Sequence, residues 1–138
     1  MTKVSAWQEN LINYIESLRF QTFQYGKSDC WLFASKCIDL QYGTDFANEF
    51  KYNSPKEAMK LLKQHGGLPK VYSERLFEKD PNYVQRGDIV VYMDVHGETS
   101  GVFMSGLVWA LGTQGIVANK PSMIEIVGVW GIPKCQQL

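Results

Sequence analysis

The sequence predicts an α+β protein in which N-terminal helices pack on a C-terminal antiparallel sheet. As far as His65, apolar residues recur at the spacing of amphipathic helices, and glycine or proline residues separate the segments. From Arg86 onward the pattern changes to short β-branched and apolar runs divided by glycine turns. Helices followed by a run of strands are typical of a layered fold with the helices on one face of the sheet. The chain of 138 residues is long enough to bury a core, so we expect a single domain over residues 1–138.

Three helices are expected in the first half of the chain, at residues 5–19, 29–42 and 55–65. A capping-box pattern at residues 5–8 (SAWQ) starts the first helix. Gly43 ends the second, because glycine adopts the left-handed cap conformation without steric cost. Residues 54–57 (SPKE) combine a serine cap, a proline and a glutamate, which together mark the start of the third. Residues 44–53 are expected to be mostly loop, and residues 68–84 to hold at most one short helix.

Five strands are expected in the second half, at residues 88–93, 101–105, 107–111, 116–119 and 124–130. A hairpin turn over residues 94–98 joins the first two. Each later strand follows its predecessor after a short turn, so the sheet is expected to be a meander.

Composition argues against several classes of function. The 14 basic and 14 acidic residues give a formal charge of zero, so nothing indicates binding to nucleic acid or anionic lipid through bulk charge. No apolar run approaches the roughly 20 residues of a membrane span, and the N-terminus lacks the pattern of a signal peptide. We therefore expect a soluble protein made in the cytosol.

The cysteines and histidines have no recognisable metal-ligand spacing. Cys30 and Cys37 would lie roughly 10 Å apart along one helix, beyond the reach of a disulfide, and Cys135 is remote in sequence. His65 and His96 are also far apart, and His65 is expected at the end of a helix. We expect reduced thiols, no metal and no cofactor.

Cys30 is the residue best placed to carry chemistry. It follows Ser28 and Asp29, which offer helix-capping oxygens, and so lies in the first turn of the second helix. The helix dipole and the unpaired N–H groups of that turn favour the thiolate, which is the nucleophilic form. The alternative is a buried structural thiol, because Cys30 shares a helical stripe with the expected core residues Phe33, Ala34, Cys37 and Ile38.

Three stretches resemble the NlpC-type cell-wall endopeptidases of the papain-like cysteine peptidase superfamily, and more closely their small phage-encoded relatives associated with tails. They are residues 25–33 (YGKSDCWLF), 86–92 (RGDIVVY) and 101–106 (GVFMSG), in the order and spacing of the family. The resemblance implies a papain-like fold in which the nucleophile helix packs on the sheet. It also implies that Cys30 occupies the nucleophile position, with backbone N–H groups at the helix start available to an oxyanion.

The other catalytic positions depart from the family. The resemblance places Ser100 where the family has its general-base histidine, and a hydroxyl does not accept a thiol proton near neutral pH as imidazole does. The family's third, polar residue lies on the next strand, where residues 108–111 (VWAL) are apolar. Trp31 replaces the small polar residue that usually follows the nucleophile, and we expect it to be a core aromatic. The candidates for lining a remnant groove are Tyr25, Trp31, Tyr92 and Trp109.

His96 is the alternative base. It precedes Ser100 by four residues, and a strand rises about 3.3 Å per residue, so an extended chain would displace it by roughly 13 Å from the usual base position. We therefore expect His96 to be a surface residue of the turn.

These observations leave three hypotheses for function. The first is a structural or assembly protein of a phage tail, catalytically inactive, with other tail proteins as partners, made in the host cytoplasm and carried in the virion. The second is an active cysteine endopeptidase or amidase that cleaves cell-wall peptides of peptidoglycan as the phage enters, with Cys30 as nucleophile and His96 as base. The third is a small-ligand or protein-binding domain unrelated to that family. The missing base and orienting residue favour the first hypothesis.

Overall fold

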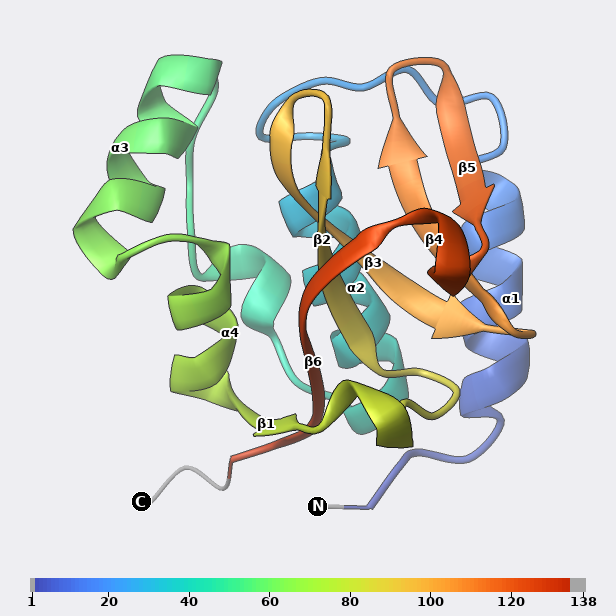
Figure 1. Ribbon diagram of the computed structural model, residues 1–138. Helices are drawn as coiled ribbons and strands as arrows, with labels where there is room; N and C mark the ends of the chain where they lie inside the picture. The colour runs from blue at the N-terminus through green and yellow to red at the C-terminus, as the bar shows by residue number, and fades with distance from the viewer. Residues whose placement is uncertain (1, 135–138) are drawn as a thin grey trace.

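The computed structural model describes residues 2–134 and contains, within that range, four α-helices and a six-stranded antiparallel sheet (Figure 1). The helices are α1 (Trp7–Ser17), α2 (Cys30–Tyr42), α3 (Pro55–His65) and α4 (Leu68–Arg75). The strands are β1 (Leu76–Lys79), β2 (Ile89–Asp94), β3 (Gly97–Met104), β4 (Leu107–Gly112), β5 (Gly115–Asn119) and β6 (Glu125–Pro133). Short 3-10 turns occur at η1 (Phe46–Asn48), η2 (Pro81–Tyr83) and η3 (Pro121–Met123). The predicted α+β class is confirmed.

The strands lie in the order β1-β6-β2-β3-β4-β5. Strands β2 to β5 follow one another as a meander, as expected. Strand β6 does not extend the meander, because the chain returns across the sheet and inserts β6 between β1 and β2. The expectation of a simple meander is therefore wrong for the last strand. Its place is decided by pairing with β1, a four-residue strand that the sequence did not reveal.

Helix α2 is the centre of the main core. Its buried residues are Trp31, Phe33, Ala34, Ser35, Cys37, Ile38 and Gln41. They share one apolar cluster with α1, α4 and the face of the sheet that carries Val91 and Val102, and Figure 1 shows α2 behind the sheet. Strand and loop residues alone form a second cluster, around Val90 and Val129. Helices α2 and α4 therefore pack on one face of the sheet, while α1 packs on α2 and α3 on α4.

The helix caps show where local sequence patterns decide structure and where they do not. Asp29 caps α2 by accepting a hydrogen bond from Leu32 N–H, and Gly43 ends the helix with φ 71°. The predicted capping box of α1 is wrong, because the residue before the helix is Ala6, with φ 58° and no side-chain cap.

Strand β3 begins earlier than predicted, since its pairing with β2 continues to the tip of the hairpin, and Ser100 therefore lies inside the strand. Cys135 lies outside the described residues.

We predict that Phe33→Ala lowers the free energy of unfolding by about 3–5 kcal/mol, because it empties a core position that is 1 % exposed. Phe20→Ala is the matched control, since Phe20 is 86 % exposed and its truncation should change stability by less than about 0.5 kcal/mol. Urea unfolding followed by circular dichroism measures both. Equal destabilisation by the two substitutions would contradict the proposed position of the core.

Candidate functional site

The start of α2 is held in place by a buried carboxylate. Asp29 is 1 % exposed, and its Oδ1 accepts a hydrogen bond from Leu32 N–H at 2.8 Å. Its Oδ2 accepts two more, from Gly26 N–H and from the Tyr52 hydroxyl, each at 2.8 Å. These bonds tie the loop before the helix and the segment after η1 to the residue that precedes Cys30.

Gly26 is the close-packed point of this arrangement. Its φ is +82°, and a Cβ at this position would lie 1.8 Å from the carbonyl oxygen of Tyr52. No side chain fits there without moving one of the two segments. The glycine of the sequence motif is therefore required by packing at the site as well as by backbone conformation.

Cys30 is partly exposed, unlike its neighbours on the helical stripe. The expectation of a core position is correct for Phe33, Ala34, Cys37 and Ile38, which are at most 1 % exposed. Cys30 lies instead at the edge of the core, where it lines a groove. Burial nevertheless raises the pKa of the Cys30 thiol, hydrogen bonds from Ser100 act to lower it, and the Asp29 charge raises it again. The net shift is upward, so the thiolate expected from the helix dipole is not favoured.

Ser100 lies beside Cys30, although the two residues are 70 positions apart in sequence. Its hydroxyl donates to the carbonyl oxygen of Cys30 at 2.9 Å and accepts from the Tyr72 hydroxyl at 2.9 Å. Ser100 is fully buried, and burial raises the pKa of Tyr72 well above its usual range. The chain Tyr72 to Ser100 to Cys30 is therefore a set of neutral hydrogen bonds that holds α4, β3 and α2 together.

Tyr72 was not identified from the sequence. It belongs to the apolar face of α4 with Leu68 and Val71, and that spacing indicates burial but not the hydrogen bond that its hydroxyl makes.

His96 lies in the two-residue turn between β2 and β3, where it is exposed, as predicted. Its backbone N–H donates to Asp94 Oδ1 at 2.7 Å. It lines the same groove as Cys30. Among the described residues, however, its imidazole forms no hydrogen bond with the thiol.

The strand that follows Ser100 supplies no orienting group. Val108, Ala110 and Leu111 in β4 are buried apolar residues, and Trp109 uses its indole N–H to donate to the Met104 carbonyl. No cluster of three or more His, Cys, Asp or Glu side chains that could hold a metal occurs between residues 2 and 134.

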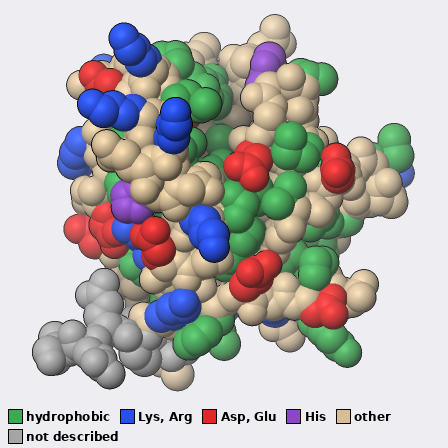
Figure 2. Space-filling model, turned by 60° about the vertical axis from the view of Figure 1, so that its left-hand side comes forward, with side chains coloured by type: hydrophobic (Ala, Val, Ile, Leu, Met, Phe, Trp, Pro, Cys, Tyr) green, Lys and Arg blue, Asp and Glu red, His purple; other side chains and the backbone are tan. Residues whose placement is uncertain are grey.

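The groove beside Cys30 has a volume of about 660 Å³. One wall is α3, the opposite wall is the turn at residues 96–98, and Cys30 and Trp31 are at its base. Figure 2 shows it as a hollow lined with hydrophobic side chains, with basic side chains gathered beside it. Tyr25 and Trp31 line this groove as expected, but Tyr92 and Trp109 do not.

Tyr92 and Trp109 lie elsewhere for a physical reason. Tyr92 follows Val91, whose side chain is in the main core, and the alternation of a strand turns Tyr92 toward the second cluster. Trp109 packs at the edge of the main core.

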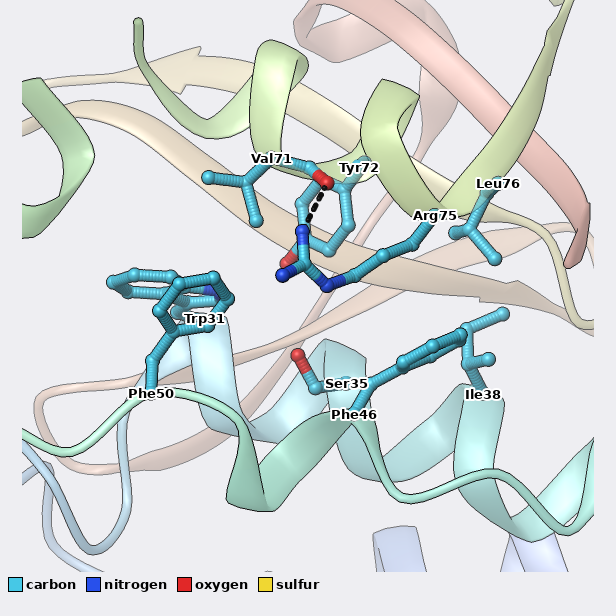
Figure 3. A pocket seen from close by; sticks show the side chains of 9 residues that line it. All are labelled: Trp31, Ser35, Ile38, Phe46, Phe50, Val71, Tyr72, Arg75 and Leu76. Atoms are coloured by element: carbon cyan, nitrogen blue, oxygen red, sulfur yellow. Dashed lines mark hydrogen bonds between the residues drawn. The ribbon is translucent and has the colours of Figure 1, made fainter. Parts of the chain in front are cut away.

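A second cavity, between α2, η1 and α4, is a packing gap (Figure 3). Its volume of about 10 Å³ is the space of a single water molecule. The guanidinium of Arg75 projects toward it, donating to the Val71 carbonyl at 3.1 Å and to Glu49 Oε2 at 2.6 Å, and it packs over Phe50. This cluster joins α4 to η1 and leaves no room for a ligand.

Comparison with known families finds a match over residues 2–132 to a family described as "Domain of unknown function (DUF6950)". No curated protein matches the sequence.

We predict that Cys30 reacts with iodoacetamide at pH 7 more slowly than free cysteine, because its raised pKa leaves less thiolate. The rate should rise with pH as the thiol ionises. His96→Ala should leave the profile unchanged, as should the control His65→Ala. Peptide-resolved mass spectrometry measures labelling of Cys30 alone, and a slower rate near pH 7 in His96→Ala only would show that the imidazole activates the thiol.

A second prediction compares Gly26, in the loop before α2, with Gly106, in the turn between β3 and β4. Gly106→Ala should cost about 1–2 kcal/mol of stability, because its φ of +76° is left-handed but nothing lies within 4 Å of the new Cβ. Gly26→Ala should cost about 1–3 kcal/mol more, because the same conformational strain is joined by a clash with the Tyr52 carbonyl. Denaturant unfolding compares the two variants, and equal losses would show that Gly26 is not a close-packed position.

Proposed function

The chain belongs to the DUF6950 family, and we propose that it is a structural or assembly component of a phage tail with a degenerate papain-like fold of the NlpC type. Three motifs in the order of the NlpC-type relatives support the fold. The mixed α+β architecture, with a cysteine at the start of a helix that packs on an antiparallel sheet, is compatible with it.

The observation that carries the proposal is the contact of Cys30 with Ser100. A cysteine nucleophile needs a base within hydrogen-bond reach whose pKa lies near the working pH. Here the side chain beside the thiol is a hydroxyl, which donates to the Cys30 carbonyl and accepts from Tyr72 but does not accept a thiol proton near neutral pH. The residues around the thiol support a structural role in preference to proton transfer.

The proposed partners are other tail proteins, and the proposed location is the host cytoplasm before assembly and the virion after it. No helix between residues 2 and 134 is long and apolar enough to cross a membrane. The formal charge of zero indicates that the net charge of the chain does not drive docking, so any electrostatic contribution comes from local groups of charges.

The second candidate is the cysteine endopeptidase or amidase acting on peptidoglycan. The specific observation in its favour is that His96 and Cys30 line the same groove. This function requires the imidazole to come within hydrogen-bond reach of the thiol, with which it forms no hydrogen bond among the described residues.

The test is a phage in which the chain carries Cys30→Ala. We expect unchanged yield of assembled tails, because truncating the partly exposed thiol leaves the Asp29 and Ser100 hydrogen bonds in place. The purified wild-type protein should release no peptide fragments from peptidoglycan, measured by chromatography. The proposal fails if the wild-type protein releases such fragments and the folded Cys30→Ala variant does not.

A further inference from the structure

The groove beside Cys30 combines an apolar floor with one basic wall. Lys56, Lys60 and Lys63 lie along α3 at the spacing of one helix face, and all three line the groove. Met59, on the same helix, is 66 % exposed at its rim, and Tyr25 is 38 % exposed across from it. Figure 2 shows the basic side chains beside the hydrophobic hollow. Such an exposed apolar surface is typical of a contact that a partner covers.

The three lysines have no acidic partner within residues 2–134, where the ion pairs involve other basic residues. Asp29 also lines the groove, but its two oxygens already accept three hydrogen bonds from the chain. Glu98, in β3, is the remaining acidic residue of the lining, and its Oε1 lies close to Gly67, where α3 passes into α4. The positive charge of the groove is therefore concentrated along α3.

We infer that this groove docks an acidic segment of a partner protein that carries apolar side chains between its carboxylates. The inference rests on the proposed assembly function and states the chemistry of the partner. The carboxylates pair with the lysines of α3, and the apolar side chains contact Met59, Tyr25 and the floor beside Trp31. Glu98 sets the orientation, because its charge beside Gly67 repels a carboxylate of the segment from the C-terminal end of α3.

The experiment is fluorescence anisotropy with the purified chain and a short fluorescein-labelled peptide that alternates glutamate and leucine. We expect saturable binding that weakens as salt is raised, because the ion pairs are exposed. The triple variant Lys56→Gln, Lys60→Gln, Lys63→Gln should bind about tenfold more weakly.

The chain offers a matched control. Lys27, Lys36 and Lys51 line a separate groove of about 360 Å³, and their triple replacement by glutamine removes the same charge. This control should bind the peptide as the wild type does. A lysine–leucine peptide and a glutamate–serine peptide should not bind, which establishes that both the acidic and the apolar groups are needed.

The inference is overturned if the glutamate–leucine peptide does not bind, if both triple variants weaken it equally, or if the lysine–leucine peptide binds as well. It is also overturned if sedimentation shows that the chain self-associates through this groove, since a second copy is then the occupant. Peptide binding is measured without the phage. A failure of the peptide to bind would therefore overturn this inference without affecting the assembly test with Cys30→Ala. Cleavage of peptidoglycan would overturn the proposed function without changing the peptide result.

Discussion

The carboxylate of Asp29 joins three separate parts of the chain. Transfer of a carboxylate from water costs several kcal/mol unless its oxygens are hydrogen-bonded. Here Leu32 N–H, Gly26 N–H and the Tyr52 hydroxyl supply the donors, and the positive end of the α2 dipole adds to them. The start of α2, the loop before it and the segment that leads to α3 are thereby held in one arrangement. The position of Cys30 and the shape of the groove both depend on it.

The packing that places Cys30 also limits its reactivity. A helix start favours the thiolate by a partial charge, but burial of the sulfur disfavours it, and the pKa of the thiol is raised. Hydrogen bonds from Ser100 act to lower the pKa but do not reverse the shift. The hydrogen bonds that join Tyr72, Ser100 and Cys30 stabilise the fold, whereas proton transfer needs a group whose pKa lies near the working pH.

Local chemistry accounts for what could be predicted from the sequence. The bounds of α2 follow from Asp29 and Gly43, because capping involves residues a few positions apart. The position of Ser100 relative to Cys30 could be predicted only from the resemblance, because the resemblance relates segments that are far apart in the chain. Features decided by distant pairing were not predictable: β1 and the return of β6 depend on each other, and the hydroxyl partner of Tyr72 is in another element. The face on which Tyr92 lies follows from the register of β2, which places its neighbour Val91 in the core.

A groove that binds and a groove that cleaves need the same shape but a different placement of charge. Cleavage needs a titratable group at the floor, next to the reacting atom, where the low dielectric strengthens its effect. In this chain the floor holds a neutral thiol and Trp31, and the neighbouring Asp29 carboxylate already accepts three hydrogen bonds. The remaining charges of the lining are the lysines of α3 and Glu98. An apolar centre with charges at the rim is the pattern of a recognition surface. The Ser100 hydroxyl fills a hydrogen-bonding place in the wall behind Cys30, where it donates to the Cys30 carbonyl. The groove is therefore better suited to holding a segment of a partner than to cutting one.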